Sequence, residues 1–383
     1  MGKPSLRRVA IIGVGMSKFG KQPERTIVEM GTEACQAAIK DAGISPKAIE
    51  VCYCANLVSV ACIGQEIGSK VGVVNREMIR VENACAGGST AIRETFYAIA
   101  TGRYDIGLAI GVDSMTTGVP RGPLVTTDID GQSGLSTPAW AAFSMRHYMK
   151  KYGATIEQFA QVSVKNHHNG TLNPYAMYQR EYSMEEILQS RMVCDPLTLF
   201  MICPTTDGAA AAILCAEEKV AQYTSTPVWI AGTALKSGGY SYFWKEIDVS
   251  NMCEQAVAEA YEMAGVGPED LDLVELHDAF AATELPNIED LQICPRGEAA
   301  HLMEEGAFDL GGKLPVNPSG GLLAQGHPLS ASGVRQVCEI TWHLRGQVGK
   351  RQVEGAKVGL AHMEGGVVTG LQGGACGINI LVR

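Results

Sequence analysis

The sequence has few charged residues, few aromatic residues and no long apolar run. Charged residues make up 19% of the 383 residues and aromatic residues 6%, and the formal net charge is −10. Lysine and arginine form no run longer than two residues. Binding to nucleic acid needs clustered positive charge, so this pattern argues against a nucleic-acid partner. No apolar stretch reaches the length that crosses a membrane, so we expect no membrane segment either.

We also expect no secretion signal. The N-terminus reads MGKPSLRRVAIIGVG, in which two arginines precede an apolar stretch of only a few residues. This stretch is too short for a signal peptide and is typical of a first strand. We therefore expect a cytoplasmic protein whose twelve cysteines are reduced thiols. Cys52, Cys54 and Cys62 lack the Cys-x-x-Cys spacing of a structural zinc site, so we expect no metal.

A dinucleotide-binding motif is lacking as well. The first predicted strand runs into IIGVGMSKFG, whose glycines Gly13, Gly15 and Gly20 have the spacing G-x-G-x-x-x-x-G. The dinucleotide fingerprint needs G-x-G-x-x-G. A tight turn therefore explains these glycines better.

What the chain does contain is an internal repeat. AIKDAGISPKAIEV (38–51) and AYEMAGVGPEDLDL (260–273) match at a fixed offset, so a helix, a glycine stop, a proline-containing turn and a strand occur twice. Strands and helices alternate along the chain, which is typical of an α/β protein. We predict two related α/β halves, residues 1–225 and 226–383. An insertion at about 116–195 in the first half would form a cap or loop domain.

One cysteine stands at an unusual position. VENACAGGSTA (81–91) places Cys85 between a predicted strand and the start of a helix, with Gly87 and Gly88 behind it. Free amides at a helix N-terminus favour a thiolate, and glycines let a substrate approach the backbone and leave amides free to hold an oxyanion. On this context alone, a reactive thiol and a buried structural cysteine are equally open.

Two histidines favour the reactive thiol. His277 lies in VELHDAF, where a strand of the second half ends, and His327 lies in the glycine-rich SGGLLAQGHPLSASG, which leads into a helix. A thiol with histidines in reach is the usual arrangement for a cysteine nucleophile. We therefore predict that Cys85 is the nucleophile.

Together these segments resemble the thiolase superfamily over essentially the whole chain. NACAGGS resembles its nucleophile motif, HDAF its second block and GGLLAQGHPLSASG its Gly-His-Pro block, and the nearest branch is that of the sterol-carrier-protein and archaeal acetoacetyl-CoA thiolases. The resemblance implies a five-layered αβαβα fold built from two duplicated halves plus a loop domain. It also implies coenzyme A as a co-substrate, no tightly bound cofactor, and a homodimer or larger assembly. Several members of this branch work with a small zinc-ribbon/OB-fold subunit, so such a partner is expected.

The resemblance assigns roles to the site residues. Cys85 accepts the acyl group, and His327 activates Cys85 and helps to hold the thioester oxygen. His277 positions a water or the thioester oxygen. The backbone amides of Cys85 and of the segment around Gly365 and Gly366 form a further oxyanion hole.

The chain departs from the family pattern at its proton-handling cysteine. The usual cysteine near the C-terminus falls at Met363 or Glu364 in LAHMEGG, and the cysteine that the nearest branch has in His-Asp-Cys-Phe is Ala279 here. Glu364 is the candidate acid/base group, provided that its pocket raises its pKa toward neutrality. Cys203 stands where the family often has a serine near the pantetheine of coenzyme A.

The expected function is therefore CoA-dependent cleavage, or Claisen condensation, of a 3-oxoacyl-CoA. The altered acid/base site and the insertion rich in methionine and tyrosine favour a bulky, branched or carboxylated substrate, as in aromatic-compound degradation, with a benzoylsuccinyl-CoA as an example. Two alternatives stay open. One is a decarboxylating condensing enzyme like the ketoacyl synthases, and the other is a non-catalytic scaffold subunit that binds acyl-CoA or lipid.

Overall fold

The computed structural model describes residues 6–57, 61–118, 129–239, 247, 249–368 and 373–383. The elements up to residue 220 are β1 (Val9–Met16), α1 (Ile27–Ala42), β2 (Val51–Ala55), α2 (Ile63–Val71), β3 (Glu77–Val81), α3 (Gly87–Ala100), β4 (Ile106–Ser114), α4 (Met115–Gly118), α5 (Ile129–Gln132), α6 (Thr137–Tyr152), α7 (Ile156–Thr171), α8 (Met184–Leu188), β5 (Met192–Cys194), β6 (Leu197–Thr198), β7 (Asp207–Ala216) and α9 (Glu217–Val220). The elements that follow are β8 (Val228–Ser237), α10 (Asn251–Ala264), β9 (Leu273–Glu275), α11 (Ala281–Asp290), α12 (Ala299–Glu304), α13 (Gly321–Gln325), α14 (Leu329–Arg345), β10 (Val358–Val367) and β11 (Gly373–Val382).

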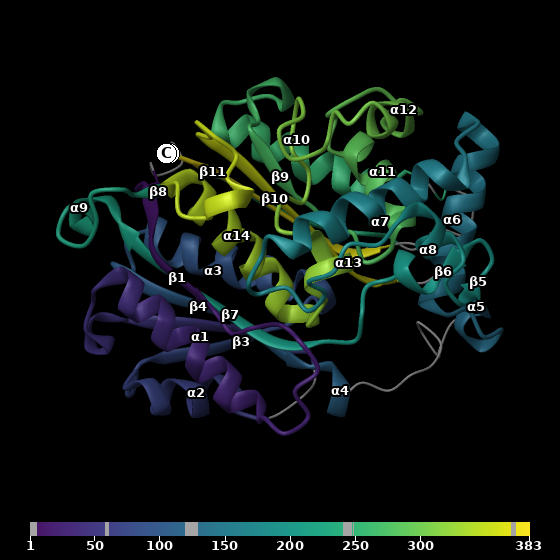
Figure 1. The fold of residues 1–383 in the computed structure, drawn as a ribbon. Helices are drawn as coiled ribbons and strands as arrows, with labels where there is room; N and C mark the ends of the chain where they lie inside the picture. Colours follow the sequence, from purple (N-terminus) through teal and green to yellow (C-terminus); the bar gives the residue numbers. More distant parts are fainter. Residues whose placement is uncertain (1–5, 58–60, 119–128, 240–246, 248, 369–372) are drawn as a thin grey trace.

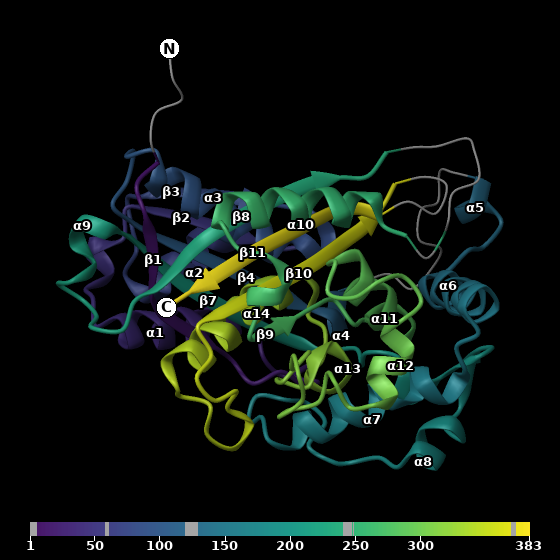
Figure 2. The same ribbon diagram turned by 90° about the horizontal axis from the view of Figure 1, so that it is seen from above.

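Nine strands form a sheet with the order β3-β2-β4-β7-β1-β8-β11-β10-β9. Its two sections meet where β1 pairs with β8 through only two residue pairs, Ala10 with Trp229 and Ile11 with Val228. Helices α3 and α14 pack against each other and against strands of both sections, whereas α1 and α2 cover the first section and α10 covers the second (Figures 1 and 2). The order is therefore helix, sheet, helix, sheet, helix, which is the αβαβα layering that the resemblance implies.

The repeat in the sequence corresponds to matching elements. Helix α1 ends at Gly43 (φ 63°), and a 3-10 turn beginning at Pro46 leads into β2. Helix α10 ends at Gly265 (φ 69°), and a 3-10 turn beginning at Pro268 leads into β9. Both glycines adopt the left-handed conformation, which a residue with a side chain adopts only at a cost. The two similar stretches of sequence thus form the same helix–turn–strand unit.

Glycines let the two central helices touch through their backbones. A Cβ atom at Gly88 of α3 would lie 2.4 Å from the carbonyl oxygen of Ser330, and one at Gly333 of α14 would lie 2.4 Å from the amide nitrogen of Ser89. These distances are below van der Waals contact, so a side chain at either position would force the helices apart. The close approach brings the two helix N-termini together, and Cys85 and His327 lie just before those N-termini.

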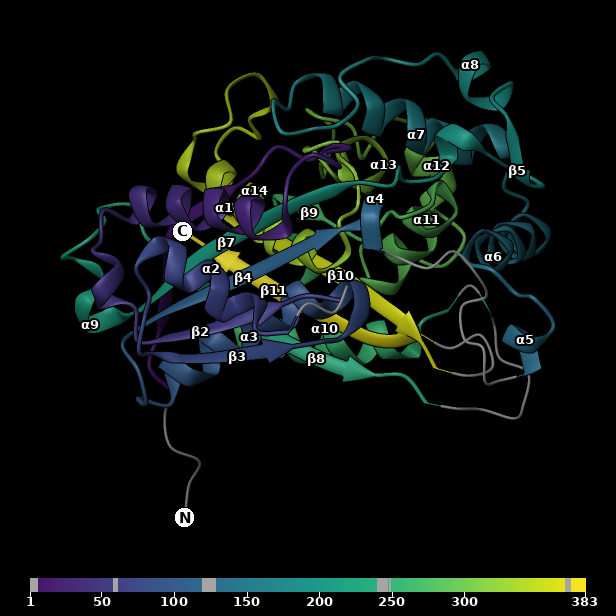
Figure 3. The same ribbon diagram turned by 90° about the horizontal axis from the view of Figure 1, so that it is seen from below.

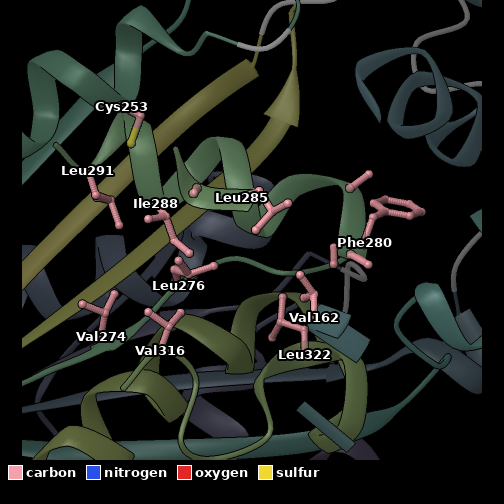
Figure 4. Packing of buried hydrophobic residues seen from close by; sticks show 14 of the residues in the cluster. Val162, Cys253, Val274, Leu276, Phe280, Leu285, Ile288, Leu291, Val316 and Leu322 are labelled. Carbon is pink, nitrogen blue, oxygen red and sulfur yellow. The ribbon is translucent and has the colours of Figure 1, made fainter. Parts of the chain in front are cut away.

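The insertion lies between β4 and β7, and its residues 119–128 are outside the described residues. Helices α6 and α7 pack against α11, and α7 also packs against α12 and α13. Figure 4 shows the core beneath α11, where Ile288 lies next to Leu276, and Val162 of α7 lies next to Leu322 of α13. The insertion therefore packs on the elements that follow His277 and precede His327. Figure 3 shows it at the opposite end of the molecule from α9.

Among the described residues, no helix is long and apolar enough to cross a membrane.

Candidate active site

The structure brings together the three residues that the sequence singles out. Cys85 lies on a 3-10 turn (Ala84–Ala86) that runs directly into α3, and its side chain is partly exposed. Its sulfur and one ring nitrogen of each of His277 and His327 all lie within 4.8 Å of one another. The two imidazole ring centres are 5.3 Å apart. Residues from three distant segments thus meet at one point.

His327 is held by the loop between α13 and α14. Gly326 just before it has φ 101°, and a Cβ atom there would lie 2.4 Å from Oγ1 of Thr206. After it, Asp113 at the end of β4 accepts a hydrogen bond of 2.7 Å from the amide of Ser330 in the first turn of α14. A carboxylate is stabilised at this position because helix N-termini carry free N–H groups. His327 itself is 5% exposed.

A hydrogen bond fixes which nitrogen of His327 carries the proton. The Ser332 hydroxyl donates to the carbonyl oxygen of Pro328 at 3.1 Å, and its oxygen is 2.8 Å from Nδ1 of His327. With the single hydroxyl proton directed to Pro328, Nδ1–H donates to Ser332 and Nε2 keeps its lone pair. Nε2 is buried without a hydrogen-bond partner. Burial, together with His277 and Arg335, lowers the pKa of His327 well below its usual range, so the ring is a neutral base.

The thiol of Cys85 is protonated at neutral pH. Burial raises the pKa of Cys85 to about 12. The amide of Gly366 acts against this rise, Asp113 adds to it, and the amide of Cys85 itself opposes it. The free amides at the helix N-terminus therefore lower the pKa of Cys85 by less than desolvation raises it. Because the thiol stays protonated, Cys85 needs a base to become a nucleophile. Nε2 of His327 is available for that role.

The Gly365–Gly366 segment faces Cys85. A Cβ atom at Gly365 would lie 2.1 Å from the carbonyl oxygen of Asn83 and 2.4 Å from the amide nitrogen of Ala86. Gly366 has φ 64°, and its amide lowers the pKa of Cys85 by donating to the sulfur. Amides that stabilise negative charge at this place are what an oxyanion hole requires.

Glu364 lies elsewhere. Side chains alternate along a strand, and since Gly365 of β10 faces the Cys85 turn, Glu364 points to the other face of the sheet. There Glu364 accepts a hydrogen bond of 2.7 Å from Ser250 and forms a second cluster with side chains whose ligand atoms all lie within 4.8 Å of one another: Cys253, His362 and Cys376. Burial raises the pKa of Glu364, as the sequence analysis requires, but the carboxylate is not placed with Cys85. Thiolate, imidazole and carboxylate are donors that zinc accepts, so these four could hold a metal.

Cys203 lies beside the segment that carries His277. Its amide donates to the carbonyl oxygen of Ala279 at 2.9 Å, and its neighbour Ile202 forms a β-bridge with Phe280. The side chain is partly exposed. Burial raises the pKa of Cys203, and the charges of Asp278 and Cys85 raise it further.

Two residues that support the site are not among the site residues predicted from the sequence. One is Ser332, and the other is Asp278, whose carboxylate accepts from the amide of Leu322 at 2.7 Å and from the side chain of Asn166 at 2.8 Å. Burial and the neighbouring Glu284 raise the pKa of Asp278 to about 7. Asp278 thereby ties the segment of His277 to α13, which precedes His327. In the sequence, their roles are indicated only by position: Asp278 follows His277 directly, and Ser332 stands five residues after His327.

The comparisons with known proteins identify the family of the chain. A family model described as "Thiolase, N-terminal domain" matches residues 9–218, and one described as "Thiolase C-terminal domain-like" matches residues 242–372. The chain is 39% identical to "Acetyl-CoA acetyltransferase" of Methanothermobacter thermautotrophicus, over 99% of this chain and 100% of that protein. It is 38% identical to "Sterol carrier protein 2" of Bos taurus, over 94% of this chain and 70% of that protein.

Two further similarities concern a subunit and a complex. The chain is 36% identical to "Benzoylsuccinyl-CoA thiolase subunit BbsB" of Thauera aromatica, over 94% of this chain and 95% of that protein. A solved structure named "Ltp2-ChsH2(DUF35) aldolase" superposes with a TM-score of 0.85 at 27% identity, over 98% of both chains.

These matches define a thiolase fold. The chain belongs to the thiolase family, and it is an enzyme of the acyltransferase class. The predicted family and fold class are confirmed.

Proposed function

We propose that this thiolase cleaves or forms a 3-oxoacyl-CoA through an acyl-enzyme on Cys85. The observation that supports the proposal is the cluster of Cys85, His277 and His327, in which Nε2 of His327 has a lone pair and no partner. A neutral thiol beside a neutral imidazole base is a nucleophile that can be activated when substrate is bound.

Each residue of the site has a distinct role in the proposed reaction. Nε2 of His327 takes the proton of Cys85, and the thiolate attacks the 3-oxo carbon. Burial lowers the pKa of His277 to about 4, so its ring is neutral, and its unpartnered Nε2 can contact the thioester oxygen. The amides of Cys85 and Gly366 stabilise the oxyanion. The bond between C2 and C3 then breaks, and coenzyme A takes the acyl group from Cys85. Glu364 has no step in this scheme because it points to the other face of the sheet.

A bulky or carboxylated substrate is part of the proposal. The similarity to a benzoylsuccinyl-CoA thiolase subunit supports it, as does the absence of a cysteine at Ala279 and Met363. We also propose coenzyme A as the co-substrate, and a small zinc-ribbon/OB-fold partner subunit. The support for the partner is that one relative is named a subunit and that the similar solved structure is a complex.

The test is a panel of 3-oxoacyl-CoA thioesters, assayed for thiolysis with mass spectrometry of the protein. We expect an acyl adduct on the peptide that contains Cys85, a preference for a bulky or carboxylated substrate, and no turnover in Cys85→Ala. Cys194→Ala is the matched control, because Cys194 is also partly exposed but lies in β5 of the insertion. Near-normal thiolysis by Cys85→Ala would contradict the acyl-enzyme, and a preference for acetoacetyl-CoA would contradict the bulky substrate.

The same assay separates the two alternatives. A decarboxylating condensing enzyme would release CO2 from a malonyl thioester and form a 3-oxoacyl product without needing free coenzyme A. A non-catalytic scaffold subunit would bind acyl-CoA but show no adduct on Cys85 with any member of the panel.

A further inference from the structure

The proposed reaction needs a second group that handles protons. When the bond between C2 and C3 breaks, its electron pair stays on C2, and the resulting enolate must be protonated there. In the reverse direction a base must remove that proton. His327 already exchanges a proton with Cys85, so another side chain near Cys85 has to serve C2.

Most groups around Cys85 are unsuited to this task. Both carboxylate oxygens of Asp113 accept from buried donors, Oδ2 from Ser330 and Oδ1 from Asn56. Glu82 is exposed and accepts from the amide of Ala84. The proposed function already places Nε2 of His277 at the thioester oxygen, so His277 is not free to serve C2.

We propose that Cys203 is the acid and base at C2 of the substrate, an inference that rests on the proposed function. The segment that contains Cys203 contacts both the segment of His277 and the loop of His327. The amide of Cys203 binds the carbonyl oxygen of Ala279, two residues after His277, and Thr206 contacts Gly326, next to His327. Cys203 and Cys85 pack against the same core, both residues are partly exposed, and the charge of Cys85 acts on the thiol of Cys203, so the two cysteines belong to the same site.

The resting state of the thiol suits a proton donor. Burial and the charges of Asp278 and Cys85 raise the pKa of Cys203, so the thiol carries its proton at neutral pH.

The proton balance is complete. In cleavage, S–H of Cys203 gives its proton to C2 of the enolate, which leaves as an acyl-CoA, and Cys203 becomes a thiolate. The thiol of the incoming coenzyme A gives its proton to Cys203. The resulting coenzyme A thiolate attacks the thioester on Cys85 and releases Cys85 as the leaving thiolate, which takes back its proton from His327. No oxidant or further reactant is needed.

The experiment measures two exchange reactions separately in the variants Cys203→Ala and Cys203→Ser. Exchange of labelled coenzyme A into an acyl-CoA does not change C2, so Cys203 keeps its proton and His327 carries the proton between Cys85 and coenzyme A. Exchange of the α-hydrogens of that acyl-CoA with D2O, followed by mass spectrometry, needs the group that serves C2. We expect Cys203→Ala to lower α-hydrogen exchange and thiolysis kcat at least ~10²-fold, the range for loss of a general acid. Coenzyme A exchange should stay within several-fold of the wild type, and Cys194→Ala should change neither reaction.

Three outcomes would overturn the inference. If Cys203→Ala keeps α-hydrogen exchange, another group serves C2. If only the KM for coenzyme A rises, Cys203 is a pantetheine contact. If both exchanges fall together, Cys203 supports the site structurally. Failure of the proposed function looks different, because then the wild-type protein itself shows no coenzyme A exchange.

Discussion

At the scale of single residues, the chemistry depends on which nitrogen of His327 carries the proton. We expect Ser332→Ala to lower thiolysis kcat about 2- to 10-fold, because the hydrogen bond from Nδ1 to Ser332 contributes about 0.5–1.5 kcal/mol. Without this bond the His327 ring can also carry its proton on Nε2, and in that form Nε2 does not accept the proton of Cys85. Ser330→Ala is the control, since Asp113 binds the backbone amide of Ser330 and that contact survives. Steady-state kinetics with a fixed substrate measures both variants. An unchanged rate in Ser332→Ala would show that the tautomer is fixed in another way.

The protonation of Cys85 gives a second prediction at this scale. The pKa of Cys85 is raised to about 12, so the thiolate fraction in the free enzyme is small at pH 7 and grows as the pH rises. The rate of alkylation of Cys85 by iodoacetamide should therefore be slow at neutral pH and increase about tenfold per pH unit up to pH 10. Peptide mass spectrometry follows the reaction at Cys85 itself. A fast rate that is flat between pH 5 and 8 would indicate a resting thiolate–imidazolium pair.

The sequence predicts the cluster better than it predicts the groups around it. Cys85, His277 and His327 stand out because each follows a strand or a glycine-rich loop, where α/β proteins expose functional groups. The position of Glu364 depends on which face of β10 it occupies, and a shift of one residue reverses that face. The raised pKa of Cys85 depends on how much water the folded site excludes, which no local pattern encodes.

At the scale of elements, the contact between α3 and α14 positions the nucleophile against its base. We expect Gly88→Ala to lower the free energy of unfolding by about 1–3 kcal/mol, the usual cost of overpacking, and to lower kcat as well, because the two helix N-termini move apart. Gly20→Ala is the matched control, since nothing lies within 4 Å of a Cβ atom there and no positive φ is required. Thermal unfolding and thiolysis assays measure both effects. Wild-type behaviour of Gly88→Ala would mean that the helices adjust without disturbing the site.

The repeated helix–turn–strand unit could be predicted because its glycine and proline positions are local signals. The pairing of β1 with β8 could not be predicted from the sequence, since it joins residues far apart in the chain through only two residue pairs. The backbone contact of Gly88 with Ser330 is likewise a long-range packing contact, and a glycine in the first turn of a helix gives no indication of its partner.

At the scale of the whole molecule, one edge of the sheet remains uncovered. In the described part of the chain, β3 pairs only with β2, and its Ile79 and Arg80 are exposed (Figure 3). An edge strand presents free N–H and C=O groups that can pair with another strand. Two copies related by a two-fold axis can meet through the same strand, so we propose β3 as the surface through which two copies of this chain pair.

The corresponding prediction is that the wild-type protein is a dimer and Ile79→Asp a monomer in size-exclusion chromatography with light scattering. A buried unpaired carboxylate at the interface is costly, and paired copies of Ile79 would place two of them close together. Phe143→Asp is the control, because Phe143 is even more exposed, at 55%, but lies on α6 of the insertion. Because β3 ends at Val81, just before the Cys85 turn, the monomer should also lose thiolysis activity. A dimer that persists in Ile79→Asp would place the interface on another surface.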